Sequence, residues 1–398
     1  MKENKTKPDI RFKGFTDDWE QRKLGDVANR FDNLRIPVAS NLRVRGLTPY
    51  YGANGIQDYV EGYTHDGEFV LIAEDGANDL KNYPVYYVNG RIWINNHAHV
   101  LQGIEKKCHN SFLAYNIGQL DIEPFLVGGG RAKLNADVMM KLYIYLPKFD
   151  EQTKIGQYFL QLDNLITLHQ REYDQLKELK KTMLKKMFPR DGSNIPEVRF
   201  AGFTDDWEQC KFSNYYKMSS GYAFKMSDYC NDGIDLINGE SIQHGMINGD
   251  KLNHLPETFI QQYPDFVLKK GDIVVGLNRP IINGNLKIAR IPSKYNDSLL
   301  YQRAGKIVYK VECDKKFSYV LLSQEILKHT LVEAVGSDQP FISTSKLDKW
   351  EMMLTADIEE QHKIGDYFSN LDNLITLHQR ELEILKNLKK TCLKRMFI

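Results

Sequence analysis

Few of the side chains that could do chemistry in this chain have a spacing that specifies a reaction. Glu74, Asp75 and Asp79 lie close enough to form an acid cluster, but the glycine among them favours a solvated turn. His97 and His99 stand two residues apart on a predicted strand and would share one face of it. Because no third ligand follows at a suggestive spacing, packing or hydrogen bonding explains these histidines better than a metal site.

The motifs of nucleotide hydrolysis and of hydrolytic catalysis are absent from the sequence. It contains no GxxxxGK[ST] phosphate loop, no HExxH zinc motif, no GxSxG nucleophile elbow and no Asn/Asp-Pro-Pro-Tyr/Phe signature of adenine methyltransferases. Pro264-Asp265 lacks a downstream Glu-x-Lys partner for a nuclease site, and the glycine run at 128–130 favours a flexible loop. The sequence therefore predicts that this chain is not an enzyme and holds no metal ion or cofactor of its own.

Basic and hydrogen-bonding side chains recur in predicted loops of both halves of the chain. Arg, Asn and Gln are the residue types that bind base edges, while Lys, Ser and Thr commonly hold phosphates. For any single residue, an ordinary polar surface is the alternative interpretation. The candidate DNA contacts are Arg43, Arg45, Tyr50, Tyr51, Asn54, Lys81, Asn82, Arg131 and Lys133 in the first half, and Asn278, Arg279, Asn285, Gln302, Arg303, Ser343 and Lys346 in the second.

Composition narrows the class of protein without naming a partner. The 398 residues suggest two or three domains, and 42% hydrophobic with 26% charged residues is typical of globular protein. The 53 basic and 52 acidic residues leave a net charge of +1, so only the distribution of charge can argue for nucleic acid. Five scattered cysteines without CxxC spacing predict free thiols in the cytoplasm. No apolar run approaches the roughly 18 residues of a membrane helix, so no membrane partner is expected.

The elements that position these loops come from an internal repeat. Residues 8–21 return as 196–209, and 151–188 match 360–397, including an identical run of eleven residues at 162–172 and 371–381. The segments between the matched parts share little similarity. Each half is therefore predicted to be a common frame that holds a different insert.

The longer repeated segment predicts two long helices that pair with each other. Both copies lack proline and place apolar residues at alternating steps of four and three, which is the coiled-coil pattern. Two equivalent modules related by a two-fold axis require the helices to run antiparallel. The extra leucines Leu165, Leu168 and Leu179, with their counterparts Leu374, Leu377 and Leu388, would widen the stripe, and both helices end in lysine-rich turns. The predicted seam residues are Ile155, Phe159, Leu162, Ile166 and Leu176, facing Ile364, Phe368, Leu371, Ile375 and Leu385.

Both inserts show short apolar runs punctuated by glycine, asparagine and aspartate, which predicts strands. Asn89-Gly90, between two such runs, predicts a hairpin turn, and short helices are expected at 111–117, around Val138 and at 317–330. The fold class is thus α+β: two strand-rich domains joined and spaced by two long antiparallel helices with pseudo-two-fold symmetry. The predicted division is a first domain at 1–150, a spacer helix at 151–190, a second domain at 191–358 and a C-terminal helix at 359–398.

This combination resembles the specificity subunit of type I restriction-modification enzymes over nearly the whole chain. The resemblance rests on paired motifs: Arg-Phe-x-Gly-Phe-x-x-x-Trp at 11–19 and 199–207, and Glu-Gln-x-Lys-Ile-Gly at 151–156 and 360–365. Similar segments inside the first insert are 50–56, 73–78 and 96–100. In one departure, the second helix is preceded by Thr355-Ala356, whereas the first follows Leu146-Pro147.

The resemblance implies a non-catalytic subunit whose two target recognition domains each read half of an asymmetric bipartite site on double-stranded DNA, with the helices fixing the spacer. It also implies two modification subunits that methylate adenine with S-adenosylmethionine, and two restriction subunits that translocate and cut with ATP and Mg²⁺. The helices and domain flanks would bind the modification subunits. The alternative hypothesis is a coiled-coil adaptor whose end domains bind proteins or glycans.

Overall fold

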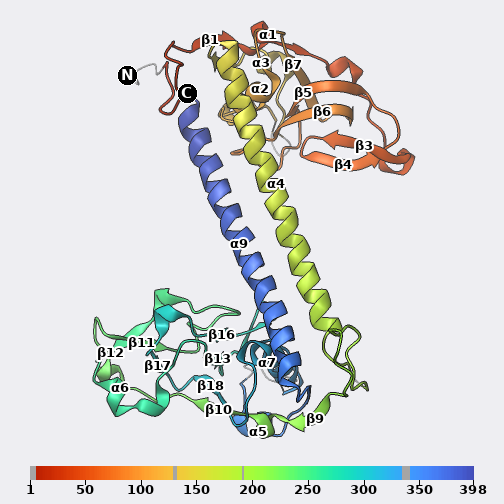
Figure 1. The fold of residues 1–398 in the computed structure, drawn as a ribbon. Coiled ribbons are helices and arrows are strands. Elements are labelled where there is room, and N and C mark those ends of the chain that lie inside the picture. Colours follow the sequence, from red (N-terminus) through yellow and green to blue (C-terminus); the bar gives the residue numbers. More distant parts are fainter. Residues whose placement is uncertain (1–5, 129–131, 191, 334–340) are drawn as a thin grey trace. The chain divides into compact units, whose positions relative to one another are not determined.

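The computed structural model describes residues 6–128, 132–190, 192–333 and 341–398 (Figure 1). Contacts divide the chain into two compact units: Met1–Glu172 with His378–Ile398, and Tyr173–Leu377. Each unit therefore combines one strand-rich domain with part of each long helix. Among the described residues, no helix is both long and apolar enough to span a lipid bilayer.

The first unit is built on a six-stranded sheet with a second, two-stranded ribbon beside the long helix. Strand β5 is the centre of the large sheet, with β7 and β6 antiparallel on its two sides, and its five C-terminal residues are buried. The sheet order is β2 (Ala28–Arg30), β7 (Ala98–Gly103), β5 (His65–Ala73), β6 (Val85–Ile94), β3 (Arg45–Gly52) and β4 (Gly55–Val60), and the ribbon pairs β1 (Glu20–Lys23) with β8 (Tyr143–Leu146).

The predicted hairpin at Asn89-Gly90 is wrong, because β6 runs through both residues without a turn. Gly90 pairs with Gly67 of β5, and each has a positive φ (+98° and +135°). Glycine takes such angles without strain, so the two strands can twist together at this pair and stay in register. The turn signal in the sequence therefore marks a locally twisted strand pair.

Short helices close the first domain. The predicted helix at 111–117 is confirmed as α2 (Asn110–Ile117), which packs buried Phe112 and Leu113 against the sheet. The helix expected around Val138 is α3 (Ala136–Met139), and α1 (Leu24–Val27) joins β1 to β2. Three single-turn 3₁₀ helices cover the remaining loops: η1 (Asp32–Leu34), η2 (Ser40–Leu42) and η3 (Glu123–Phe125).

The second unit divides its strands among smaller sheets. A four-stranded antiparallel sheet carries the fully buried strand β13, and helix α7 supplies ten buried residues beside it, confirming the helix expected at 317–330. The four-stranded order is β10 (Tyr216–Ser220), β18 (Ala304–Tyr309), β13 (Ile273–Gly276) and β16 (Ile288–Arg290), and the three-stranded order is β12 (Asn253–Leu255), β11 (Ile234–Ile237) and β17 (Leu299–Leu300).

The remaining pairs and helices of this unit are short. Two-stranded pairings join β9 (Glu208–Lys211) to β19 (Glu351–Leu354) and β14 (Ile281–Ile282) to β15 (Asn285–Leu286). The helices are α5 (Phe212–Tyr215), α6 (Phe259–Gln262), α7 (Lys315–Glu333) and α8 (Thr344–Leu347), with 3₁₀ turns η4 (Met226–Asp228), η5 (Gly249–Lys251), η6 (Pro264–Phe266) and η7 (Ser293–Tyr295).

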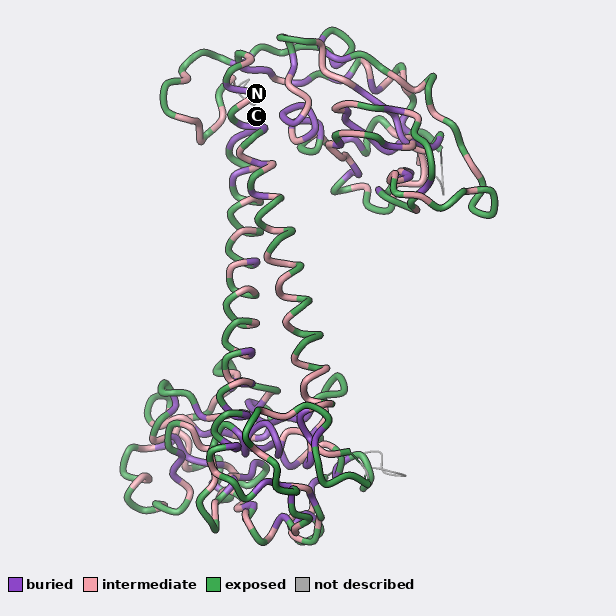
Figure 2. Tube along the Cα trace, turned by 45° about the vertical axis from the view of Figure 1, so that its right-hand side comes forward, coloured by how far each residue is buried: buried purple, intermediate pink, exposed green. Residues whose placement is uncertain are grey.

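The two long helices are α4 (Phe149–Lys186) and α9 (Ile358–Met396). Within each unit their segments pair antiparallel: Tyr158 lies beside Cys392 and Asp163 binds Lys389 in the first, and Lys180 binds Asp372 in the second. All ten predicted seam residues are buried or half-buried. Figure 2 shows that burial is concentrated in the strand-rich domains and thins along the helices.

The predicted widening of the seam by extra leucines is wrong. Leu165, Leu168 and Leu179 on α4 are 40–50% exposed, and so are Leu374, Leu377 and Leu388 on α9. An antiparallel pair of helices buries only one stripe of each helix, and these leucines lie outside that stripe. Each unit thus presents the same three leucines to solvent.

The two units repeat one set of contacts between the motif segments and the helices, which we call the frame. Arg11 forms a two-pronged ion pair with buried Glu151, and Arg199 does the same with buried Glu360. Glu151 and Glu360 open equivalent helices. A guanidinium that binds both carboxylate oxygens fixes orientation as well as distance, so this pair sets how each helix leaves its domain.

The far ends of the helices complete the frame. Phe397, just after α9, packs on Trp19 in the first unit, and Phe188, just after α4, packs on Trp207 in the second, at centroid distances of 6.2 and 5.7 Å. Backbone bonds repeat as well, from Ile10 N–H to the carbonyl of Arg395 and from Val198 N–H to that of Lys186. Each domain is therefore closed by the end of the helix that began in the other unit.

The departure at Thr355-Ala356 leaves the start of the second helix intact. Asp357 accepts hydrogen bonds from the backbone N–H groups of Glu359 and Glu360, which caps α9. Gln361 then donates to the carbonyl of Thr355, much as Gln152 donates to that of Pro147 in the first unit. Side-chain capping here replaces the proline that precedes α4.

Candidate nucleic-acid interface

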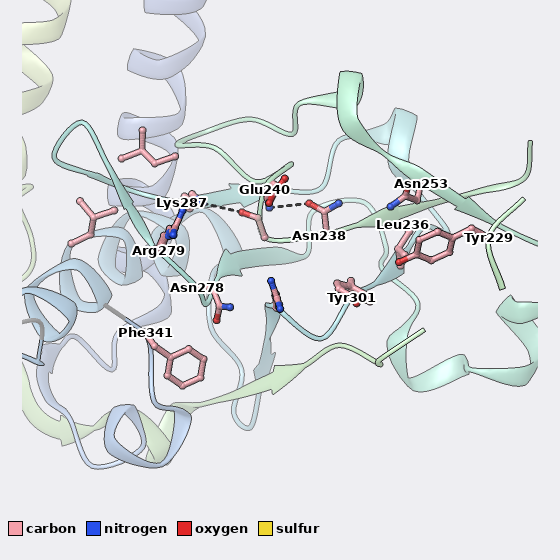
Figure 3. Close-up of a pocket in the computed structure, with 14 residues that line it drawn as sticks. Tyr229, Leu236, Asn238, Glu240, Asn253, Asn278, Arg279, Lys287, Tyr301 and Phe341 are labelled. Atoms are coloured by element: carbon pink, nitrogen blue, oxygen red, sulfur yellow. Dashed lines mark hydrogen bonds between the residues drawn. The ribbon is translucent and has the colours of Figure 1, made fainter. Parts of the chain in front are cut away.

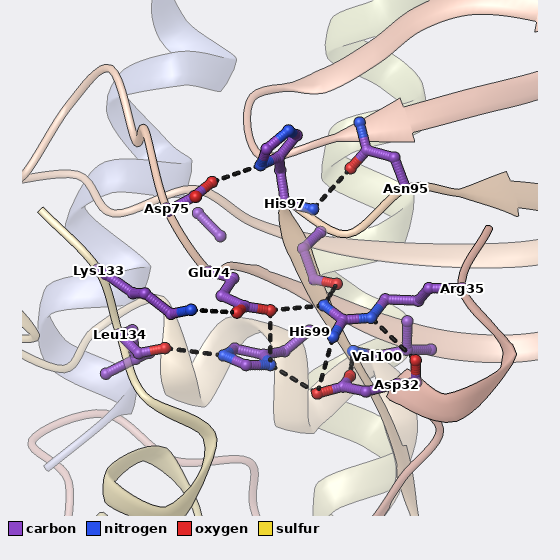
Figure 4. A network of polar contacts seen from close by, with 12 residues as sticks. Asp32, Arg35, Glu74, Asp75, Asn95, His97, His99, Val100, Lys133 and Leu134 are labelled. Atoms are coloured by element: carbon purple, nitrogen blue, oxygen red, sulfur yellow. Dashed lines mark hydrogen bonds and ion pairs between the residues drawn. The ribbon is translucent and has the colours of Figure 1, made fainter. Parts of the chain in front are cut away.

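A largely buried polar network lies beneath the loops of the first domain, with His99 fully buried and Asp32, Arg35 and Glu74 half-buried (Figure 4). Arg35 donates to Glu74 at 2.6 Å and to the carbonyl of Ala98, while His99 Nδ1 lies 2.7 Å from Asp32 and its Nε2 lies 2.9 Å from the carbonyl of Leu134. The expectation of a solvated turn is wrong for Glu74, whose side chain is only 13% exposed. The network joins η1, β7 and the loop after β5.

Charge in this network stabilises the ionised carboxylates. Burial opposes ionisation of Asp32, but hydrogen bonds from His99 and from the N–H of Val100 outweigh it and lower the pKa of Asp32. Burial also opposes ionisation of Glu74, and hydrogen bonds from Arg35 and Lys133 again leave its pKa lowered. The loop after β5 is thus held by paired charges that persist at neutral pH.

The three insert segments that resemble the specificity family meet around this network. His97 Nδ1 lies 2.6 Å from Asp75, so the histidine orients the loop after β5 as a hydrogen-bonding residue. Asn54, at the β3–β4 turn, donates to the carbonyl of Gly76 and accepts from the N–H of Asn78. Segments far apart in sequence thereby form one polar surface, built from the loops 53–55, 75–82 and 132–133.

The structure separates the candidate contacts of the first half into two groups. Asn54, Lys81, Asn82 and Lys133 belong to the polar surface just described, although Lys133 also pairs with Glu74 at 2.9 Å. Asn82 is held by Asp79. Arg131 lies outside the described residues.

The second group runs from just before β3 to the end of that strand. Arg45 is exposed there, whereas Arg43 stacks over the ring of Tyr50 at 4.1 Å and is 15% exposed. Tyr50 is 1% exposed, and its hydroxyl bonds to Val38. Tyr51 is half-buried against the sheet core. In this conformation Tyr50 supports the fold and is not accessible to a ligand.

A basic groove runs between the first domain and the end of α9. It has a volume of about 840 Å³ and is lined by Lys81, Asn82 and four lysines of the helix, Lys386, Lys389, Lys390 and Lys394, together with three carboxylates, Asp121, Glu123 and Asp163. Lys389 is engaged by Asp163, but Lys390 and Lys394 are exposed. The lysine-rich turn of α9 therefore lies beside the first domain, on the same unit as the polar surface.

The second domain presents a pocket of about 880 Å³ instead of a loop surface (Figure 3). Three of the candidate contacts, Asn278, Arg279 and Arg303, line it. Six further polar residues that no sequence motif marks also line it: Tyr229, Asn238, Glu240, Asn253, Lys287 and Tyr301. The pocket brings together residues from β11, β12, the β13–β14 loop and the β17–β18 loop, so no local motif could have revealed it.

Lys287 forms the cationic floor of this pocket. It is only 7% exposed, and its Nζ donates to the carbonyl of Gly239 at 3.2 Å. Burial lowers the pKa of Lys287, because a charged amine loses hydration there. Beside it, Arg279 is exposed and has a φ of +44°, an uncommon angle for a residue other than glycine. The pocket therefore presents two positive groups, Lys287 and Arg279, beside the carboxylate of Glu240.

The other candidates of the second half lie around or away from the pocket. Gln302 is exposed between two pocket residues, Tyr301 and Arg303, and Asn285 is exposed on the short β15 strand. Ser343 lies 3.1 Å from Ser345 through their hydroxyl oxygens, and Lys346 is paired with Glu333. These last two belong to the start of α8 and are not pocket residues.

Comparison with known proteins identifies this combination of frame and inserts. The chain matches the family model for the type I restriction modification DNA specificity domain twice, at residues 16–178 and 204–387. It is 27% identical over 391 residues to the type I restriction enzyme MjaVIII specificity subunit of Methanocaldococcus jannaschii, covering 94% of this chain and 91% of that protein.

A second relative is more similar over a shorter stretch. The putative type I restriction enzyme specificity subunit S.HindORF215P of Haemophilus influenzae is 48% identical over 155 residues, which is 39% of this chain and 40% of that one. Among solved structures, the type I restriction-modification S subunit from M. genitalium shares the fold, with a TM-score of 0.71 at 14% identity over 98% of this chain and 99% of that one.

Proposed function

Since the chain belongs to the type I restriction modification DNA specificity family, and is the non-catalytic DNA specificity subunit of such a system, we propose that each strand-rich domain reads one half of an asymmetric bipartite DNA site. The observation that carries the proposal is the repeated frame with two different polar surfaces. A shared frame presents both domains to DNA in the same way, while different surfaces select different bases.

In the first domain, the polar surface supplies base contacts and the basic groove holds phosphates. Asn82 and the nearby Asn78 can offer amide groups to base edges, since asparagine pairs with adenine through both its donor and its acceptor. Lys81, Lys390 and Lys394 provide positive charge along the groove. The buried ion pairs of Asp32, Arg35 and Glu74 hold the loops before DNA arrives, which lowers the entropy lost on binding.

In the second domain, the pocket residues carry the specificity. Arg279 and Arg303 can each donate two parallel hydrogen bonds to the O6 and N7 acceptors of guanine. Asn238, Asn253 and Asn278 offer amide groups in the same pocket. The two domains present different polar side chains in different arrangements, which predicts two half-sites of different sequence.

The paired helices would set the length of DNA between the half-sites. Adding one heptad to α4 and one to α9, at the level of His169 and His378, keeps the seam in register and lengthens each helix by about 10.5 Å. At 3.4 Å per base pair this length corresponds to about three base pairs, which also turn one half-site by about 100°. Sites with the wild-type spacer should therefore no longer be methylated. An unchanged spacer in the methylated sites would contradict the role of the helices as a ruler.

The duplicated frame also suggests how many partners assemble. Each unit exposes the same three leucines on its helix segments, and two equivalent surfaces can bind two copies of one partner. We propose that these surfaces dock two methyltransferase subunits, which use S-adenosylmethionine, and that two restriction subunits using ATP and Mg²⁺ join them. Substituting Leu168 and Leu377 with aspartate should prevent methyltransferase binding in a pull-down, while circular dichroism stays unchanged.

The function is tested with the chain and its methyltransferase partner together. Binding to a duplex that carries the methylated motif should fall steeply with salt, because phosphate contacts release counterions. Inserting one base pair in the spacer turns one half-site by roughly 34° and should abolish selectivity. Binding that ignores both salt and spacer would instead support a protein or glycan adaptor.

A further inference from the structure

Two histidines and two glutamates meet where α4 and α9 pair within the first unit. His169 and Glu172 come from α4, and His378 and Glu381 come from α9. Both pairs belong to the identical run shared by the two repeats, so the antiparallel pairing brings the same two residues together from each helix. On each helix the histidine and the glutamate are three residues apart and therefore share one face.

The ligand atoms of this cluster already have the separations of a metal site. The two Nδ1 atoms lie 3.0 Å apart. Each histidine is closer to the glutamate of the opposite helix, at 3.1 Å for His169–Glu381 and 3.4 Å for His378–Glu172, than to its own, at 3.8 Å in both cases. Ligands at 2.0–2.2 Å from a tetrahedral zinc ion stand about 3.3–3.6 Å from one another. The His–His and His–Glu separations, from 3.0 to 3.8 Å, bracket that spacing. His169, Glu172 and His378 lie together within ligand distance, and Glu381 adds its contact with His169.

Hydrogen bonding alone does not satisfy the cluster. When both rings are neutral and a single N–H lies between the two Nδ1 atoms, that hydrogen bond uses the one Nδ1–H donor and leaves none for the glutamates. The nearby carboxylate, which only accepts, then faces another acceptor. A bound cation removes this conflict, because it accepts electron pairs from both imidazoles and both carboxylates at once.

In a second cluster of similar composition, the carboxylates are already neutralised by a side-chain cation. Asp32, Glu74 and His99 also lie within ligand distance of one another. There the guanidinium of Arg35 stands between the two carboxylates, 2.6 Å from Glu74 and 3.7 Å from Asp32 (Figure 4). The helix cluster has no side-chain cation among the contacts described for its ligand atoms.

On α4 the cluster lies beyond the well-buried part of the helix, since no α4 residue between 163 and 186 is fully buried, whereas six earlier residues are. On α9, Leu382 beside Glu381 is buried. The imidazoles are 21% and 17% exposed, so an ion can reach them from solvent. We propose that His169, Glu172, His378 and Glu381 bind one divalent transition-metal ion of the zinc class, which cross-links α4 to α9. The proposal does not depend on DNA reading.

The test uses the full-length chain, stripped with EDTA and titrated with ZnCl₂ by calorimetry. We expect one equivalent to bind, and a rise in the melting temperature on adding zinc. Removing a residue that only supports a metal ligand typically lowers metal affinity 10–100-fold. Because the two histidines would bind the ion directly, the double variant His169→Gln/His378→Gln should lose at least this much zinc affinity. His362→Gln, at an exposed histidine of α9, is the matched control and should bind as the unaltered chain does.

Two further measurements keep the test decisive if the histidine variant is poorly folded. Glu172→Gln/Glu381→Gln leaves both rings in place and should also weaken zinc binding. Co²⁺ in the unaltered chain should give the intense visible bands of tetrahedral coordination. Failure of the unaltered chain to bind zinc, or equal affinity in the unaltered chain and both double variants, would overturn the proposal.

Discussion

The frame of this protein is the same in both units, whereas the inserts differ. The frame repeats contact by contact: the pairs Arg11–Glu151 and Trp19–Phe397 in the first unit have counterparts in Arg199–Glu360 and Trp207–Phe188 in the second. The inserts share no such correspondence, because one forms a six-stranded sheet and the other divides its strands among smaller sheets. Assembly and recognition are thus assigned to separate parts of the chain, so recognition can change without disturbing assembly.

The sharpest way to break the equivalence of the frames is to remove the aromatic residues that close them. Phe188→Ala and Phe397→Ala should each lower the free energy of unfolding by about 3–5 kcal/mol, since each ring fills a buried aromatic cluster. The loss should appear in the unit into which the ring packs, as localised by hydrogen–deuterium exchange. Leu165→Ala, at an exposed leucine, should change stability by less than about 0.5 kcal/mol. If each variant instead raised hydrogen–deuterium exchange equally in both units, the two frames would not be closed separately.

The difference between the inserts is tested next by Arg279→Ala. We expect a loss of about 1–3 kcal/mol in binding, confined to duplexes that carry the half-site of the second domain. Duplexes altered in the other half should show the same discrimination as before. Lys269→Ala, at a surface ion pair with Asp297 away from the pocket, serves as control. A uniform loss over both half-sites would show that Arg279 contacts phosphate and not a base.

Lys390→Ala and Lys394→Ala test the basic groove of the first unit. Each phosphate contact removed should reduce the slope of log K against log salt by about 0.9. Sequence preference should stay the same, because phosphates carry no base identity. The measurement is fluorescence anisotropy over a salt series, and a changed preference with an unchanged slope would refute the assignment.

Acid should distinguish the two units more subtly. The pKa of Asp32 and the pKa of Glu74 are lower in the folded chain than in the unfolded chain. Their contribution to stability is therefore complete above the unfolded pKa values near 4, and it is lost as the pH falls through the folded pKa values. In the described part of the second unit, the carboxyls with a lowered pKa lie in surface ion pairs. The first unit should therefore lose more stability as the pH falls below about 4, and Asp32→Asn/Glu74→Gln should remove the difference. Parallel loss in both units would exclude this network as its source.

The fold could be predicted from the sequence where the spacing of nearby residues alone determines the structure. The spacing of Ile155, Phe159 and Leu162 allows one buried stripe, and the structure buries all three. Asn89-Gly90 misled because the turn signal is local, whereas pairing with Gly67 on the neighbouring strand decides the conformation. The exposed leucines misled because composition does not show how wide a stripe the partner helix covers.

The candidate site was less predictable, because it depends on which distant segments meet. Tyr50 carries a hydrogen-bonding group like its neighbours, but its ring faces the core. Lys287 carries no signal that distinguishes it from other lysines until the pocket forms around it. For His169 and His378 a signal did exist, since both copies place a histidine in the seam with a glutamate three residues later.

The central claim is that one chain holds two different reading domains on a repeated frame. Its most direct test is sequencing of methylated adenines in cells that express the methyltransferase partner with a chimera in which the first insert, 22–147, replaces the second, 210–355. We expect one half of the wild-type motif to disappear and the other half to appear twice, as an inverted repeat across the same spacer. A chimera that still methylates the wild-type asymmetric motif would contradict this claim.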